Sequence, residues 1–298
     1  MKKILAIAIA TAISAPAMAD LTIGGSMDYR LQSTDGDLAS GMESNIDFNA
    51  SSEADNGMFI KAYIQLEQWN ADGTMGANAA QGVDVDDNFI ELGNATASVK
   101  LGSFVVPGAW ATGDDDWQVA PAAGDRYQGH NMWLGNGFGA EPVDTRATAD
   151  AQVTLNVTEG VQVVYSVALD SGATDDAYQL YASADLGGVV VKAELEDTGA
   201  TAADEGFAVS AATTVSGVAL NVSYAKNEAD TSSAKFMASY NGFELNVQND
   251  DYAAGTDGET SYFGSYKTAL PMAGASLTLG AGAGEDSDTF GARIDYKF

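Results

Sequence analysis

The chain has 298 residues, with 42 Asp and Glu against 13 Lys and Arg, one His and no Cys. The formal net charge of −29 excludes nucleic acid as a partner, because phosphate binding needs a basic stripe. The lack of Cys excludes disulfides and thiolate chemistry, and a hydrophobic content of 46% is too high for a charge-expanded disordered chain.

The N-terminus has the pattern of an export signal. Lys2 and Lys3 precede an apolar run over residues 4–13, and Ala17-Met18-Ala19 resembles a cleavage site. This run is too short to span a bilayer, which takes about 20 apolar residues. We expect a cleaved signal peptide over residues 1–19 and a mature chain over residues 20–298. An exported chain without a later apolar helix is either a soluble secreted protein or an outer-membrane barrel.

Apolar and polar residues alternate through almost every segment after Asp20, a period typical of strands. In the first segment Leu21 and Ile23 share one face. In the last, Phe290 to Phe298 alternates in the same way. We predict about sixteen strands, near 20–31, 44–52, 58–69, 87–94, 98–105, 150–157, 161–169, 177–184, 188–196, 206–213, 217–225, 233–240, 242–249, 260–267, 274–282 and 289–298.

The links between these strands alternate in length. Short links such as Asn241-Gly242 alternate with longer acidic ones, of which 35–41 is the first and 71–86 the second. Alternating link lengths and an even strand number are typical of outer-membrane barrels, whose strands take about 9–11 residues to cross. The fold class that we predict is all-β, a transmembrane antiparallel up-and-down barrel of about 16 strands. A soluble secreted sandwich or β-helix is the alternative, because one buried face gives the same alternation.

One link, residues 106–149, is far longer than a hairpin loop and must have its own role. It holds Pro107, Pro121 and Pro142, the only histidine, His130, and three of the four tryptophans. No proline falls in a predicted strand, as expected of a residue that cannot donate to a central ladder.

The signal peptide, the alternating strands, Val99 to Ser103 leading into the long link, and the C-terminal residues Phe290 to Phe298 together resemble the general diffusion porins of Gram-negative bacteria. The nearest likeness is to the acidic, Rhodobacter-like porins of alpha-proteobacteria. The resemblance implies a homotrimer in the outer membrane, in contact with lipid and lipopolysaccharide, with the third loop, about 106–149, folded into the lumen. It also implies that Tyr296 and Phe298 form the signal read by the barrel-assembly machinery.

Strand parity predicts which charges line the lumen. Arg30, Lys61 and Lys100 fall on polar faces and lie on early strands near the long loop, so we interpret them as a basic wall at the constriction. The loop supplies charges to face that wall: the acidic Asp114, Asp115, Asp116, Asp125, Glu141 and Asp144, and the basic Arg126 and Arg146. Opposed charges across a confined passage order water and discriminate solutes by charge and dipole.

Asp114, Asp115 and Asp116 have two other interpretations. They form either a solvated loop tip or a Ca²⁺ site that holds the loop, since clustered carboxylates suit a hard cation and calcium among loop carboxylates is known in the resembling family. No other cofactor is expected. The acidic outer loops predict a negative rim and weak cation selectivity.

Three rival functions remain open on the sequence. A lipid hydrolase would have to use His130, and the chain has no G-x-S-x-G motif, so we expect no enzyme. A substrate-specific channel, for sugars for example, would use the loop aromatics Trp110, Trp117, Tyr127 and Trp133 as a stacking track, although the same residues would equally pack the loop against the wall. A non-conducting adhesin or structural barrel is the third.

Overall fold

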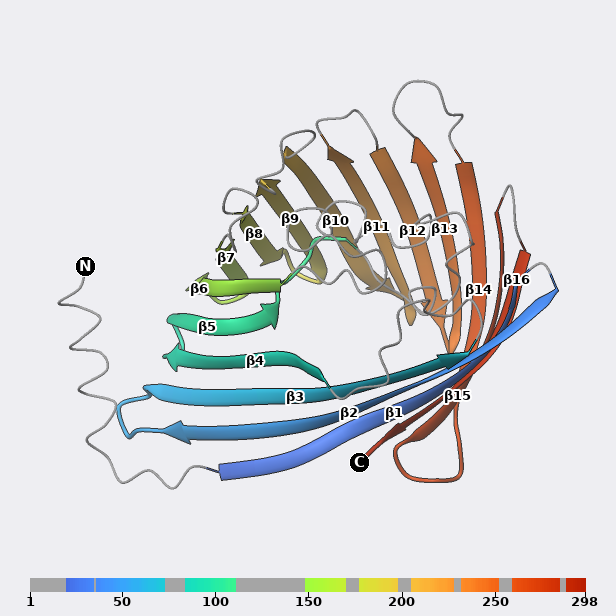
Figure 1. Ribbon diagram of the computed structural model, residues 1–298. Helices are drawn as coiled ribbons and strands as arrows, with labels where there is room; N and C mark the ends of the chain where they lie inside the picture. The colour runs from blue at the N-terminus through green and yellow to red at the C-terminus, as the bar shows by residue number, and fades with distance from the viewer. Residues whose placement is uncertain are drawn as a thin grey trace.

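The computed structural model describes residues 20–34, 36–72, 84–110, 148–169, 177–197, 205–227, 232–251, 259–284 and 288–298. These residues form sixteen strands that follow one another around a single barrel (Figure 1). Their bounds are β1 Asp20–Thr34, β2 Asp37–Glu53, β3 Phe59–Asp72, β4 Asp84–Gly93, β5 Ala97–Val105, β6 Thr148–Thr158, β7 Val161–Ala168, β8 Ala177–Asp185, β9 Val189–Asp197, β10 Glu205–Val215, β11 Val218–Asn227, β12 Ser232–Tyr240, β13 Phe243–Asp251, β14 Glu259–Ala269, β15 Ala275–Ala283 and β16 Asp288–Lys297.

The sheet is closed. Each strand pairs antiparallel with its neighbours in sequence, and β1 pairs with β16, for example Arg30 opposite Arg293. Phe298 completes the seam, because its backbone N–H and C=O both bond to Gly25 at 3.1 Å. Closure leaves no unpaired strand edge, which confirms the predicted all-β barrel of sixteen antiparallel strands.

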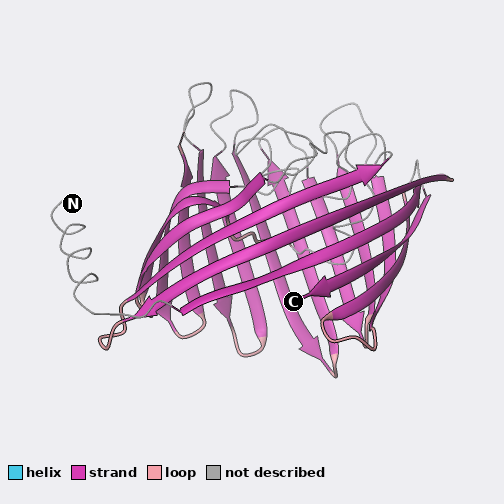
Figure 2. Ribbon diagram, turned by 60° about the horizontal axis from the view of Figure 1, so that its bottom comes forward, coloured by secondary structure: helices cyan, strands magenta, loops and turns pink. Residues whose placement is uncertain are grey.

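The short links form tight turns gathered at one end of the barrel, here the short-turn end (Figure 2). Asn241 and Gly242 both have positive φ, 50° and 82°, and join β12 to β13 in two residues. This is the backbone that a two-residue hairpin needs and that Asn-Gly favours. The sequence therefore predicted the tight turns correctly.

The first hairpin differs from its prediction. We expected a longer loop at 35–41, but β2 already begins at Asp37, and Thr34 pairs with Asp37. Leu38, 66% exposed, continues the outward face of β2. Small residues at 39–41 separate it from the next large apolar residue and hide the period-two pattern, so the prediction of a loop was wrong.

Large apolar side chains cover the outside of the barrel. They alternate along each strand with inward polar side chains, so that Leu245 and Ile294 are half-exposed while Asn246 and Thr278 are buried. Outward aromatic pairs lie toward both ends, Phe207 with Tyr224 at one and Phe243 with Tyr266 at the other. An apolar band between aromatic girdles is the surface of a barrel in a bilayer. Among the described residues, no helix is long and apolar enough to cross a membrane.

Candidate functional site

The inner face of the barrel is polar, and we take it as the candidate site. Many of its side chains are buried although they are polar or charged. They are Gln32, Glu43, Ser98, Gln152, Ser166, Gln179, Glu194, Glu196, Ser210, Ser223, Ser233, Lys235, Asn246, Gln248, Asp250, Ser261, Ser265, Thr278 and Thr289. A buried polar lining needs partners, because an unpaired polar group away from water costs about 1–3 kcal/mol.

Arg30 lies on this inner face, between carboxylates on two strands. Its Nε is 2.5 Å from Asp28 Oδ1 on β1, and its Nη2 is 2.7 Å from Glu43 Oε2 on β2. Asn45 donates to the other oxygen of Glu43 at 2.8 Å. The guanidinium is held in one place by charge-assisted hydrogen bonds, and its charge is balanced locally.

Arg293 repeats the arrangement across the β1–β16 seam. Its Nε is 2.9 Å from Asp295 Oδ1, but the N–H does not point at that oxygen, so the contact is an ion pair without a hydrogen bond. Register places Arg30 opposite Arg293 and Asp28 opposite Asp295. Like charges directly opposite repel, and the pairing along each strand offsets that repulsion.

The structure places Lys61 and Lys100 on the inner face as well, in different surroundings. Lys61 Nζ is 3.8 Å from Glu91 Oε2 and its side chain is half-exposed. The ammonium of Lys100 lies over two aromatic rings, 4.5 Å from the centre of Phe89 and 4.9 Å from that of Phe104. The three basic residues singled out in the sequence thus lie on three separate strands. Lys61 and Lys100 come together on either side of Glu91, which is opposite both of them on β4, whereas Arg30 has other partners.

Phe104 lies just after a bulge in β5, and its side chain is buried. The register between β5 and β6 shifts between Leu101 and Phe104, and Gly102 within it has φ +140°. A Cβ on Gly102 would lie 2.1 Å from Asn88 O, so no larger residue fits. Beyond the bulge, Phe104 and Val106 are buried together with Ala149. β-Bulges re-aim the side chains next to them.

The next residues, 106–110, are here called the loop root. They contact the inner face of distant strands. Gln179 Nε2 on β8 donates to Pro107 O at 3.0 Å, and the Ala109 N–H donates to Glu194 Oε2 on β9 at 2.7 Å. Ala109 and Trp110 are buried with Ala208 and Ala225, which face each other on β10 and β11. The start of the long link therefore lies inside the barrel.

The rest of the long link falls outside the described residues. That holds for Asp114, Asp115, Asp116, Asp125, Glu141, Asp144, Arg126 and Arg146, and for Trp117, Tyr127, His130 and Trp133. In the described part of the chain, no group of three or more His, Asp or Glu residues is placed to hold a metal ion. Calcium at Asp114 to Asp116 stays a prediction.

Sequence reasoning missed Gln179, Glu194 and the seat formed by Ala208 and Ala225. Strand parity would have placed Lys192, Glu194 and Glu196 on the inner face, since charges at alternate positions of β9 are visible in the sequence. What no pattern encodes is the contact of Glu194 with Ala109, 85 positions earlier in the chain.

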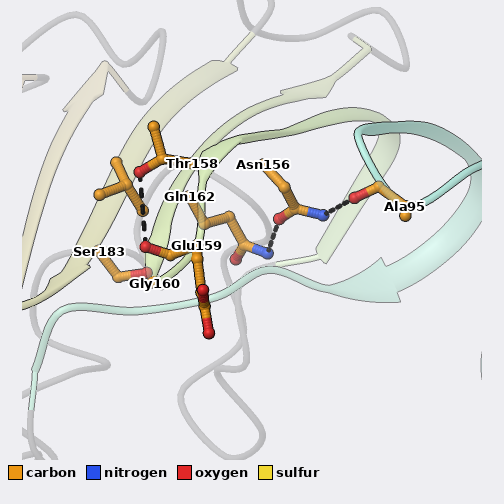
Figure 3. A pocket seen from close by; sticks show the side chains of 8 residues that line it. Ala95, Asn156, Thr158, Glu159, Gly160, Gln162 and Ser183 are labelled. Carbon is orange, nitrogen blue, oxygen red and sulfur yellow. Dashed lines mark hydrogen bonds between the residues drawn. The ribbon is translucent and has the colours of Figure 1, made fainter.

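A separate hollow of about 540 Å³ lies at the short-turn end, lined by Ala95, Asn156, Thr158, Glu159, Gly160, Val161, Gln162 and Ser183 (Figure 3). Asn156 donates to Ala95 O at 2.8 Å and accepts from Gln162 Nε2 at 3.1 Å. These bonds tie the β4–β5 turn to β6 and β7. The hollow forms part of the barrel rim.

The two C-terminal aromatics lie at the seam. Tyr296 is directed outward and its ring stacks on that of Phe298, with 5.9 Å between the ring centres. Their use as an assembly signal stays a prediction.

Comparison with known proteins agrees with this geometry. A family model described as Gram-negative porin matches residues 6–298. Among solved structures, a loop-deletion mutant of OmpT, an outer membrane protein of Vibrio cholerae, aligns over 94% of this chain and 99% of its own, at 15% identity and a TM-score of 0.68. A mutant of Rh. blastica porin aligns over 94% of this chain and 100% of its own, at 12% identity and a TM-score of 0.65.

No curated protein is a significant sequence match. The structural likenesses, at such low identity, establish the fold. The family follows from the model, which spans nearly the whole chain. With its closed sixteen-stranded barrel, polar lumen and apolar outer band, this outer-membrane chain belongs to the Gram-negative porin family.

Proposed function

We propose that this porin is a water-filled channel for passive diffusion of small hydrophilic solutes and ions, with weak selectivity for cations. One observation carries the proposal: the inner face of the closed barrel is polar while its outer face is apolar. A polar lumen in a bilayer holds water and lets polar solutes pass without a specific site.

The charge of the described inner face supports the cation preference. Carboxylates outnumber basic groups there. By strand parity the acidic residues of this face include Asp20, Asp28, Asp37, Glu43, Asp47, Glu53, Glu67, Asp87, Glu91, Asp150, Asp185, Glu194, Glu196, Glu244, Asp250 and Asp295, and the basic ones are Arg30, Lys61, Lys100, Lys192, Lys235, Lys267, Arg293 and Lys297. A net negative lining raises the local concentration of cations. The preference is weak because basic groups also line this face and several charges offset each other locally, as Arg30 does with Asp28 and Glu43.

The proposal includes a long third loop that narrows the lumen. The loop root supports it, because residues 107–110 already lie against β8 to β11. Of the aromatics considered for a sugar track, Trp110 is 4% exposed and packs on Ala225. A buried ring offers no stacking surface, so this residue favours the packing role over a substrate-specific channel.

The test is conductance of the purified protein in a planar bilayer. We expect large, steady current steps in KCl and a reversal potential in a salt gradient that shows modest preference for K⁺. Absence of current would overturn the proposal in favour of a non-conducting barrel. Saturable block by one sugar would instead establish the substrate-specific channel.

We also propose that the protein is a homotrimer that contacts lipopolysaccharide in the outer leaflet and is inserted by the barrel-assembly machinery. The family supports these proposals. Mass measurement of the detergent-solubilised native complex, corrected for detergent, tests the trimer. A mass of one chain would contradict it.

A further inference from the structure

We propose that Gln179 and Glu194, with the Ala208–Ala225 seat, form a latch that holds the loop root against the lumen wall formed by β8 to β11 and keeps the channel open. The inference rests on the proposed channel function. It goes further by assigning four positioning residues outside the loop itself.

Two hydrogen bonds of opposite sense make the latch. Gln179 donates to the carbonyl of Pro107, and Glu194 accepts from the N–H of Ala109. The two wall residues lie on the adjacent strands β8 and β9, and the two loop groups are two residues apart. A donor and an acceptor spaced in this way fix both the position and the direction of the backbone.

Glu194 makes the stronger of these bonds. Its side chain is 4% exposed and the N–O distance is 2.7 Å. Burial strengthens a hydrogen bond of this length. Removing the Glu194 side chain would leave the buried N–H of Ala109 without its acceptor, which is costly.

The Ala208–Ala225 seat positions the loop root by packing against it. Ala208 and Ala225 lie directly opposite each other on β10 and β11, and both are buried beside Ala109 and Trp110. Alanine at both positions leaves the space that the loop root occupies. A longer side chain at either position would compete with Trp110 for that space, because interiors are close-packed.

The latch is the second of two points that direct this part of the chain. The first is the end of β5, where Phe104 and Val105 stay paired with β6 beyond the bulge at Gly102. A chain held at the end of β5 alone would pivot about it. Held also at Glu194, four strands away along the sheet, the loop root has a fixed course across the lumen wall.

Channel recordings compare the variants E194A, E194Q and E196A with wild type. Glu196 is the matched control, because it lies two residues along the same face of β9 and is also buried, yet its Oε1 has no hydrogen-bond partner in the described chain. We expect E194A to shift the open–closed equilibrium under applied voltage toward closure by about tenfold or more. E194Q, whose amide oxygen still accepts the Ala109 N–H, should retain most of the open state, and E196A should behave as wild type.

A second measurement does not depend on conduction. The chain has no cysteine, so A109C introduces a single thiol at a position that is fully buried and keeps its backbone N–H. We expect a maleimide to label this thiol slowly in the parent and in combination with E196A, and at least several-fold faster with E194A. A225V, which crowds the seat, should also speed labelling, and it serves if E194A does not fold.

The outcomes separate the two proposals. A wild-type protein that carries no current overturns the channel, while the labelling rates still decide whether the latch exists. Equal labelling of A109C with and without E194A and A225V overturns the latch. So does an E196A variant that closes as readily as E194A, because the effect would then follow from the loss of any buried carboxyl group on this face of β9 and not from the lost hydrogen bond to Ala109.

Discussion

Two walls of the barrel direct carboxylates toward the lumen, one formed by β1, β2 and β16 and the other by β8 and β9. The carboxylates of the two walls have different hydrogen-bond and ion-pair partners. On the first wall Asp28, Glu43 and Asp295 lie against guanidinium groups. On the second, Glu194 accepts a backbone N–H from the loop root. One wall is a set of paired charges, and the other is a surface that receives another part of the chain.

This difference shows that a charged residue on the lumen face of a porin need not act on solutes. Arg30 is placed to shape the field in the passage, because it is held but still 14% exposed at its side chain. Glu194 instead holds the backbone of the loop root, because it accepts a hydrogen bond from the Ala109 N–H. The variant with the largest expected effect changes the bulge in β5, the strand from which the loop root leads to the second wall.

Gly102→Val should have the largest effect. The new side chain would meet Asn88 O at 2.1 Å from its Cβ, on a backbone with φ +140°. We expect a loss of about 4 kcal/mol or more, or no folded barrel at all. Heat-modifiable gel mobility and urea unfolding measure it. Gly187→Val is the control: its φ is also positive, at +76°, but no atom lies within 4 Å of its Cβ, so a comparable loss there would contradict the steric argument.

Val222→Arg tests the distinction between inner and outer faces that both walls share. Val222 is 51% exposed in the middle of β11, on the outer face. Placing a guanidinium in the hydrocarbon there should cost about 2–4 kcal/mol. The measurement is urea-dependent folding into lipid vesicles. Asn221→Arg, one residue away on the lumen face, should cost clearly less, and equal losses would mean that the two faces are misassigned.

Arg30→Met should have an intermediate effect on stability, and it tests whether the charges of the first wall are coupled as pairs. It leaves Asp28 and Glu43 without their cation, so we expect about 1–3 kcal/mol of destabilisation at these partly buried sites. The loss of a lumen cation should also raise the K⁺ preference, measured as the reversal potential in a KCl gradient. Combining Arg30→Met with E43Q removes one of the two carboxylates left without a cation, so the double variant should recover part of the lost stability. No recovery would show that the pair is not coupled.

Lys61→Met should have the smallest effect on stability. Its ammonium is 3.8 Å from Glu91 and half-exposed, a geometry that contributes about 0–1 kcal/mol. Unfolding in urea should therefore barely change, while the reversal potential moves in the same direction as for Arg30→Met. A loss of stability as large as that of Arg30→Met would remove the contrast between a held and a loosely held lumen charge.

The barrel was predictable because closure forces a period of two on every strand, so residues such as Leu245 and Asn246 reveal their faces by type alone. The prediction was wrong at 35–41, where small residues give no hydrophobic contrast. Lumen charges such as Arg30 follow from parity, yet their partners do not. The contact of Ala109 with Glu194 joins segments 85 residues apart, and local sequence carries no record of it.

The reciprocal bonds between Gly25 and Phe298 have a consequence for biogenesis. The first strand cannot be paired on both edges until the last residue has arrived, so the ring cannot close while the chain is still being delivered. Pairings that link the two ends of a chain are slow to form, and an unpaired edge is a template for aggregation. A chaperone that delivers this polypeptide to the membrane must therefore cover the edge of its N-terminal strand until the last strand has been delivered.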